Sequence, residues 1–357
     1  MSPVQGSLLA AAGGSERGVG VADDKLDGTT VKGGAGSAIL GDFRLQRSRL
    51  EGTLVELLSF EVQCPHLAEA ATGILRVSRP SADARGVVVL TSGQHGTGLW
   101  SASNLAQRAI AQLCDRGLTV VELAWDKSWL SAAAGLREGV VALAARPATV
   151  FRWVHEEYFK ASGLSHVPGR CGFALAGVSG GASQLTYALT HYGLAAIVDL
   201  AIPISGPPHA AQEKGCLRNP QEQDYWYDEM HSKIIDLSYG FDSEGGPCAR
   251  HDRSWTGRWL VEGNASAGIH YFPHTTVHMI LGARDRTESV AHALDFLLRL
   301  RASGSPRTSL EIVDSMGHLV QHSSAGIEAV VHALLPDADQ ERDLEHAVTV
   351  VNEQLPR

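Results

Sequence analysis

The stretch Leu175-Ala176-Gly177-Val178-Ser179-Gly180-Gly181-Ala182-Ser183 decides how this chain is interpreted. A short apolar run over 172–178 predicts a buried strand before the serine, and 182–192 predicts a helix after it. A Gly-x-Ser-x-Gly pattern between a strand and a helix predicts a sharp turn that lifts the Ser179 hydroxyl clear of the sheet. The two flanking glycines avoid collisions with the neighbouring strand and helix. The helix N-terminus favours negative charge beside the hydroxyl.

The pentapeptide alone does not establish a nucleophile. Glycine–serine turns between strands and helices are common, and this chain contains 38 glycines, so the pattern can arise by chance. The rest of the chain must therefore supply the argument for catalysis.

Composition sets the class of protein. The 357 residues are 44% hydrophobic and 19% charged, which is typical of one large globular domain that could carry an inserted subdomain. The net charge is −9, and nothing in the sequence suggests a nucleic-acid footprint, which would need a basic patch. No apolar run reaches the roughly 20 residues of a membrane span, so no transmembrane segment is expected.

The two ends of the chain differ from its middle. Residues 1–38 are rich in Gly, Ala and Ser, and we expect a disordered leader. The short apolar run over 8–12 has no basic residue before it, so it is not read as a signal peptide. Residues 336–357 are expected to form a helix or a tail.

Cysteine usage leaves the compartment open. Cys216 and Cys248 lie in loop-rich sequence and could form a disulfide or remain free. A disulfide would indicate a secreted protein, and free thiols would leave a cytoplasmic one as the default. No cysteine or histidine spacing typical of a metal site occurs, and no metal or cofactor is expected.

Strands and helices alternate along most of the chain. This pattern predicts a mostly parallel central sheet flanked by helices on both faces. The alternation stops over 209–273, so the core is expected over 39–208 and 274–335, with an insertion between them. The expected strands cover 54–63, 72–78, 86–91, 118–124, 172–178, 196–204, 276–281 and 309–313.

Three further strand-end loops carry groups that could work with Ser179, because sites in such sheets lie at the carboxyl ends of the strands. The loop over 92–98 is glycine-rich and could bring an amide to an oxyanion; a phosphate-binding loop is the alternative, without the spacing of a known motif. Asp285 follows the 276–281 strand, where it could instead cap the next helix. His318 follows the 309–313 strand, and Asp314 is a rival acid close to it in sequence.

Serine, aspartate and histidine in this arrangement suit nucleophilic catalysis. His318 would accept the Ser179 proton and later give it to the leaving group, while Asp285 would fix the imidazole tautomer. The backbone amides of Gly180 and Gln94 would hold the oxyanion.

The chain resembles the α/β-hydrolase superfamily over roughly 54–335. The resemblance rests on GVSGG at 177–181, GARD at 282–285, GH at 317–318 and SGQHG at 92–96. It implies Ser179 as nucleophile, Asp285 as acid and His318 as base. It also implies Gln94 as the second oxyanion amide, with His95 as the alternative. The chain lacks an HGGG motif, which makes the hormone-sensitive-lipase type of esterase a poor match.

The resemblance favours a serine hydrolase that cleaves carboxylic esters. The same triad also serves other acyl transfers, peptidases and hydroxynitrile lyases, and a non-catalytic binding protein on this fold is a further alternative. An aspartate nucleophile, as in dehalogenases and epoxide hydrolases of this fold, is disfavoured by Ser179.

The insertion over 209–273 falls where the superfamily places its cap, and it is rich in aromatic residues. These rings could wall a substrate pocket or simply fill the core of the insertion. We single out Tyr225, Trp226 and Tyr227, together with Trp125 after the 118–124 strand. The aromatic content and the acidic balance predict a small or medium neutral ester with apolar or aryl groups.

Overall fold

The computed structural model describes residues 40–51, 54–166, 171–241 and 245–335. The expected leader over 1–38 and the expected helix or tail over 336–357 lie outside the described residues.

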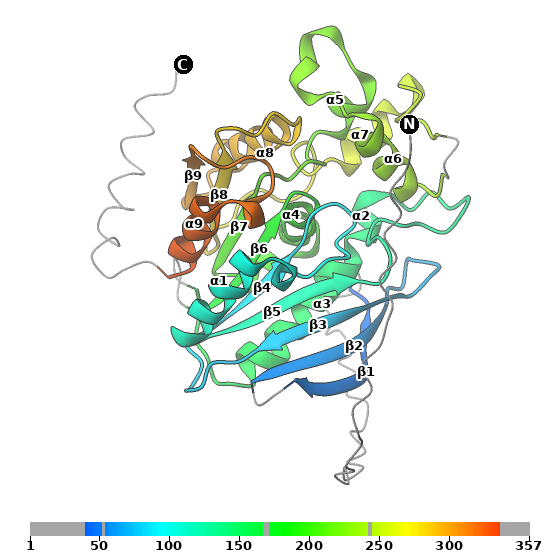
Figure 1. Cartoon of the computed structure of the whole chain (residues 1–357). Coiled ribbons are helices and arrows are strands. Elements are labelled where there is room, and N and C mark those ends of the chain that lie inside the picture. Colours follow the sequence, from blue (N-terminus) through cyan, green and yellow to red (C-terminus); the bar gives the residue numbers. More distant parts are fainter. Residues whose placement is uncertain (1–39, 52–53, 167–170, 242–244, 336–357) are drawn as a thin grey trace, which may run out of the picture.

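A nine-stranded sheet in the described part of the chain forms the centre of the molecule, in the order β1-β2-β3-β5-β4-β6-β7-β8-β9 (Figure 1). The first three strands pair antiparallel, and β3 also pairs antiparallel with β5. All remaining pairs are parallel. The strands are β1 (Asp42–Glu51), β2 (Val55–Gln63), β3 (Ala71–Ser78), β4 (Gly86–Thr91), β5 (Leu118–Trp125), β6 (Phe173–Val178), β7 (Leu200–Ile204), β8 (Thr276–Gly282) and β9 (Thr308–Val313).

The central strands are apolar because both of their faces are covered. Every residue of β4, β5, β6 and β7 is buried, as expected for parallel strands between two helical layers. Val87 and Val89 pack into one core, while Val88 and Leu90 pack into the other. The mostly parallel sheet with helices on both faces, predicted from sequence, is confirmed.

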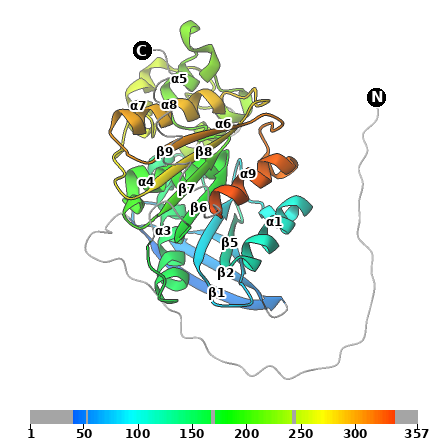
Figure 2. The same cartoon turned by 90° about the vertical axis from the view of Figure 1, so that its left-hand side faces the viewer.

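Helices α1 and α9 cover one face of the sheet, and α3, α4 and α8 cover the other (Figure 2). The α-helices are α1 (Asn104–Asp115), α2 (Gly139–Leu143), α3 (Ala145–Val154), α4 (Gly180–Tyr192), α5 (Gln212–Leu217), α6 (Glu229–Ser238), α7 (Thr256–Glu262), α8 (Ser289–Ala302) and α9 (Ser324–Leu334). None of the described helices is both long and apolar enough to cross a membrane.

The structure adds one strand that was not predicted and shortens another that was. Strand β1 was not predicted, because it is an edge strand with charged residues at Arg44, Arg47 and Arg49 and no apolar run. The strand expected over 196–204 begins only at Leu200. Its first residues instead form the short 3₁₀ helix η3 (Leu194–Ala196) and a turn.

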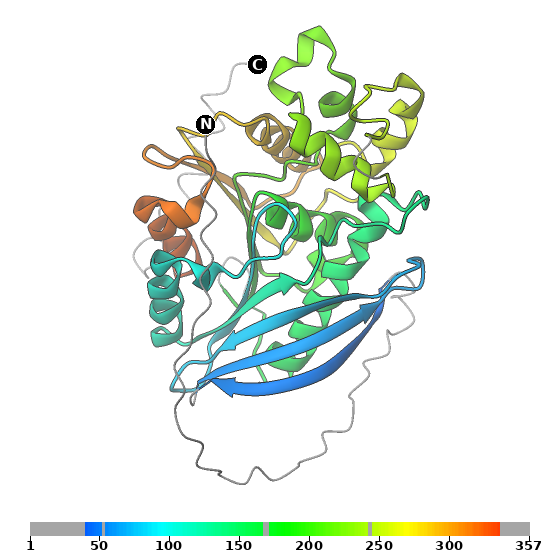
Figure 3. The ribbon, with the colours of Figure 1, turned by 45° about the vertical axis from the view of Figure 1, so that its right-hand side comes forward.

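The insertion between β7 and β8 contains only helices and loops in its described part. Besides α5, α6 and α7 it holds the 3₁₀ helices η4 (Pro220–Tyr225) and η5 (Arg253–Trp255). Figure 3 shows these helices gathered beside α2, and both α6 and α7 contact α2.

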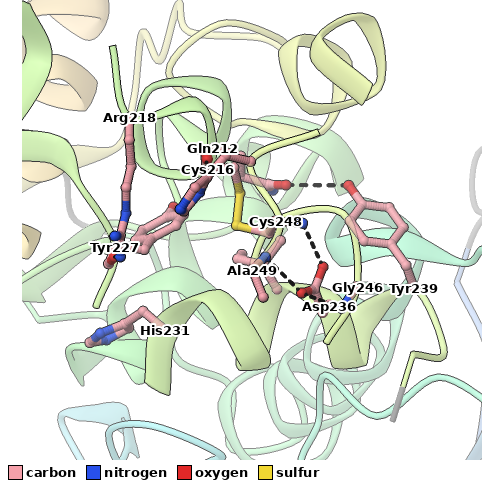
Figure 4. The surroundings of a disulfide bond; sticks show 12 residues. Gln212, Cys216, Arg218, Tyr227, His231, Asp236, Tyr239, Gly246, Cys248 and Ala249 are labelled. Carbon is pink, nitrogen blue, oxygen red and sulfur yellow. Dashed lines mark hydrogen bonds between the residues drawn. A yellow bond between two sulfur atoms is a disulfide. The ribbon is translucent and has the colours of Figure 1, made fainter. Parts of the chain in front are cut away.

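A disulfide between Cys216 and Cys248 joins α5 to the loop that follows α6 (Figure 4). The buried carboxylate of Asp236, on α6, accepts hydrogen bonds from the amides of Gly246, Cys248 and Ala249 at 2.8–2.9 Å. The disulfide and Asp236 therefore fix α5, α6 and this loop to one another.

Candidate active site

The loops that follow β4, β6, β8 and β9 carry the residues singled out from the sequence. These strands run parallel in one sheet, so their carboxyl ends meet at the same edge. Ser179 follows β6 directly, Asp285 follows β8, and His318 follows β9. The topology thus brings the three side chains to one edge of the sheet.

Ser179 occupies a sharp turn between β6 and α4. Its backbone has φ 53° and ψ −117°, a conformation that costs a non-glycine residue of order 1–3 kcal/mol. Its amide donates a 2.8 Å hydrogen bond to the carbonyl of Ile204, which ties the turn to β7. Strain held in place at a strand end is typical of a functional residue.

Close backbone packing explains the glycines around the turn. A Cβ atom at Gly177 would lie 2.6 Å from the Gly181 backbone, and one at Gly181 would lie 2.5 Å from the carbonyl oxygen of Thr91. The Thr91 hydroxyl donates a 3.1 Å hydrogen bond to the Gly181 carbonyl. The turn is therefore clamped between the end of β4 and the start of α4.

Asp285 and His318 form a hydrogen-bonded pair. The His318 Nδ1 atom donates to Asp285 Oδ2 at 2.8 Å, and the carboxylate is fully buried. Burial alone would raise the pKa of Asp285, but the hydrogen bonds from His318 and Thr287 outweigh it and lower the pKa below its usual 3.8. The rival Asp314 is exposed. Asp285 is thus the carboxylate that contacts the imidazole.

Thr287 completes this pair, although it was not singled out from the sequence. Its amide and its hydroxyl both donate to Asp285 Oδ1, at 2.9 and 2.8 Å. Its Oγ1 also lies 3.2 Å from His318 Nδ1. The spacing Asp-x-Thr after a strand is a signal for such a local turn, but the contact with His318 depends on β9 and cannot be read from it.

The loop after β4 packs against the serine turn. A Cβ atom at Gly93 would lie 3.4 Å from the Ser179 Cβ, and one at Gly180 would lie 2.9 Å from the Gln94 amide nitrogen. Gln94 itself has φ 49°. The backbone of Gln94 therefore lies against Gly180, beside the serine.

His95 faces a different environment. Its Nδ1 atom is buried and has no hydrogen-bond partner among the described residues. Burial lowers the pKa of His95, so its ring is neutral at pH 7. Among the described residues, the Ser179 hydroxyl makes no direct hydrogen bond to His318. Hydrogen bonds between a nucleophile and its base are often long when no substrate is bound.

The aromatic residues suggested as pocket walls have packing roles. Trp125 is 2% exposed and donates to Gln184 Oε1. Tyr227 is fully buried, donates to the Pro208 carbonyl and stacks on His292. They are core residues, because each ring fills space between elements and its polar group bonds to a buried partner.

The two neighbouring aromatics are partly exposed and also have structural partners. The Tyr225 hydroxyl donates to Asp295 on α8 at 2.9 Å, and the Trp226 indole donates to the Asn219 carbonyl at 3.0 Å. These contacts hold the loop before α6 in place. Their aromatic character was the signal used from sequence, and it does not report which way a ring points.

Two features of the insertion lie close to the strand-end loops and were missed from sequence. His231 of α6 makes an ion pair with Glu288, three residues after Asp285, at 2.7 Å. An open groove of about 700 Å³ lies along α6 beside His95. Both depend on contacts between segments far apart in the chain, so no local motif signals them.

The described residues contain no cluster of three or more His, Cys, Asp and Glu side chains that could hold a metal ion.

No family model matches the chain, and no curated protein matches its sequence. Similar solved structures include an esterase/lipase from an uncultured bacterium, 14% identical, with 83% of this chain and 87% of that chain covered and a TM-score of 0.48. Carboxyl esterase 2 from the mycorrhizal fungus Tuber melanosporum is 13% identical, with 74% and 81% covered and a TM-score of 0.48. A thermostable esterase from Pseudomonas putida is 12% identical, with 85% and 83% covered and a TM-score of 0.46.

The chain's own topology identifies the fold. It has a mostly parallel sheet with helices on both faces, a strained serine turn between β6 and α4, and a helical insertion between β7 and β8. This is the α/β-hydrolase fold.

Proposed function

We propose that this protein is a serine hydrolase that cleaves carboxylic esters through an acyl-enzyme intermediate. The observation that carries the proposal is the 2.8 Å hydrogen bond between Asp285 and His318 at the sheet edge where Ser179 stands in a strained turn. This is the set of groups that acyl transfer requires.

In the first half of the reaction, the Ser179 oxygen attacks the ester carbonyl carbon and its proton passes to His318 Nε2. The Nδ1 proton of His318 stays on its hydrogen bond to Asp285, whose buried charge stabilises the imidazolium. The carbonyl oxygen becomes an oxyanion held by the amides of Gly180 and Gln94. One such donor contributes about 2.7–4 kcal/mol to the barrier reduction.

The carbon–oxygen bond to the alcohol then breaks and His318 gives the alcohol its proton, which leaves the acyl-enzyme. In the second half, water attacks the acyl-enzyme and gives a proton to His318, and His318 returns this proton to the Ser179 oxygen as the acid leaves. The insertion over 209–273 acts as a cap that selects the substrate, a neutral ester with apolar or aryl groups.

The test is turnover of p-nitrophenyl esters and labelling by a fluorophosphonate probe. We expect Ser179→Ala to lose ester turnover and labelling, while Ser183→Ala, one helical turn further along α4, keeps both. Anilide and cyanohydrin substrates, run in parallel, separate an esterase from a peptidase and a hydroxynitrile lyase. Labelling of Ser183 or Ser205, or full activity in Ser179→Ala, would overturn the assignment.

A further inference from the structure

The groove along α6 has an apolar face aimed at open space. Met230, Ile234 and Leu237 line it, at the four- and three-residue spacing that places side chains on one face of a helix. Phe241, just after the helix, also lines it. Met230 is 40% exposed, although it is a large apolar side chain. The volume of about 700 Å³ lies in the range of pockets that bind small molecules.

The groove adjoins the candidate nucleophile through one loop. Gly93 and Gln94 pack against the Ser179–Gly180 turn, and the Gln94 side-chain nitrogen lies 3.4 Å from the Met230 sulfur. His95, the next residue, lines the groove itself. The same loop therefore contacts both the serine turn and α6.

The charged residues that line the groove disfavour an anion. The carboxylates of Asp228 and Glu229 line one end of it. The one cation among its described lining residues, Lys233, is paired with Glu229 at 2.6 Å. Burial lowers the pKa of His95, so its ring adds no positive charge at neutral pH.

We propose that this groove binds the apolar acyl chain of a neutral, medium-chain ester. The inference rests on the proposed acyl-enzyme function of Ser179. The leaving alcohol must lie beside His318, which protonates it, whereas the groove opens from the loop that would hold the oxyanion. The chain that enters the groove is therefore the acyl chain. The face from Met230 to Leu237 spans roughly 10 Å at 1.5 Å per residue, which sets the medium length.

The experiment compares p-nitrophenyl acetate and octanoate on the full-length protein. Burial of each methylene raises kcat/KM by up to roughly fourfold, the equivalent of about 0.8 kcal/mol per buried CH2. Leu237→Trp fills the groove and should lower kcat/KM for the octanoate roughly tenfold or more, while turnover of the acetate stays close to that of wild type. Leu260→Trp, on an exposed apolar residue of α7 that does not line this groove, is the matched control and should change neither.

A second variant and a binding measurement keep the test decisive. Met230→Trp stands at an exposed position, so it decides the question if Leu237→Trp does not fold. In the Ser179→Ala background, the octanoate should bind more tightly than the acetate, and Leu237→Trp should remove that difference.

The mono-p-nitrophenyl ester of suberic acid, which keeps one free carboxylate, tests whether the groove disfavours a negative charge. It should react roughly tenfold more slowly than the octanoate, because that carboxylate would meet the carboxylates of Asp228 and Glu229.

The outcomes separate the two proposals. Suppose that no ester is turned over, but that the octanoate still binds more tightly than the acetate and Leu237→Trp removes this difference. This result would overturn the esterase function and keep the groove as a binding site. Normal turnover with the same chain-length preference in wild type, Leu237→Trp and Met230→Trp would overturn the groove and keep the esterase function.

Discussion

The strand-end loops and the helical insertion are held in place by different kinds of interaction. The turn at Ser179 is fixed by backbone contacts with β4 and β7, two fully buried parallel strands. Helix α6 is fixed by side chains: Asp236 binds three amides of the loop that carries Cys248, and His231 pairs with Glu288.

This difference predicts that reaction chemistry and substrate selection can be changed separately. Changes at the sheet edge should alter the rate for every ester alike. Changes in the insertion should alter the stability of α6 and the chain-length preference. The segment from Asp285 to Glu288 belongs to both regions, since one end binds His318 and the other binds His231.

The largest effect is expected at Asp285. Asp285→Asn should lower kcat by about 10⁴-fold, because an amide leaves the imidazole in the wrong tautomer. The ratio of octanoate to acetate turnover should stay that of wild type, since α6 is untouched. Asp314→Asn, at an exposed position, is the matched control. If Asp314→Asn instead shows the large loss of kcat, then Asp314 is the acid and the assignment to Asp285 is wrong.

The next effect is expected at the disulfide. It closes a loop with a sequence separation of 32 residues, and chain-entropy reasoning gives about 3–4 kcal/mol of stability for a loop of this size. Urea unfolding of the Cys216→Ser/Cys248→Ser double variant should show a loss of this order, and the chain-length preference should weaken because the Asp236-bound loop loosens. Cys114→Ser, at a free thiol, should cost much less.

The same bond can be tested with a reductant on the wild-type protein. If the reductant changes neither the unfolding curve nor the number of free thiols counted under denaturing conditions, the Cys216–Cys248 disulfide does not form in the protein. The insertion is then held without it.

A smaller effect is expected at Thr287. Its hydroxyl donates to the Asp285 carboxylate, and a hydrogen bond to a charged group contributes about 1.5–3 kcal/mol. Thr287→Val keeps the shape of the side chain and the amide bond but removes the hydroxyl, so kcat should fall roughly 10- to 100-fold with little change in KM.

Thr287→Ser restores the hydroxyl and should restore most of kcat. In an Asp285→Asn background the valine substitution should add little, because the two residues act on the same imidazole. A purely structural role would instead lower the unfolding midpoint and leave kcat of the folded protein unchanged.

These two regions were also unequally predictable from sequence. A continuous apolar run such as GVVVLT over β4 indicates a strand that is buried on both faces. The positions of such strands and of the loops after them could therefore be predicted directly from the sequence. The positions of Ser179, Asp285 and His318 at strand ends followed in turn. Edge strand β1 lacks such a run, and its place depends on pairing with β2.

The insertion could be recognised from sequence but not interpreted. Its aromatic residues suggested a pocket, yet Tyr227 fills the core, and the groove is lined by Phe241 together with the apolar face of α6. The pair of His231 and Glu288 joins residues 57 positions apart, which no local spacing encodes. Side-chain contacts between distant segments are the part that sequence patterns do not carry.

The smallest effect concerns the pair of His231 and Glu288, which joins the two regions. Burial alone would lower the pKa of His231, but the carboxylates of Glu288 and Asp228 outweigh it and raise the pKa above its usual 6.5. A histidine with a raised folded pKa contributes stability that is fully present below about pH 6.5 and is lost as the pH rises through the folded pKa. The tie between α6 and the acid loop should therefore weaken at alkaline pH.

His209 and His292 also interact with the charge of His231, and burial lowers the pKa of both, so they cost stability at acid pH and this cost is lost as the pH rises to about 6.5. The wild-type pH dependence is thus a sum, and the difference between wild type and His231→Gln gives the part that depends on the charge of His231. We expect urea unfolding between about pH 6 and 9 to give a higher free energy of unfolding for wild type than for the variant. This difference should be largest at the acid end and should shrink as the pH rises. His66→Gln, at an exposed position, is the matched control and should change the free energy of unfolding little. A constant difference for His231→Gln would mean that its ring stabilises α6 by packing alone, and that charge does not couple the insertion to the acid loop.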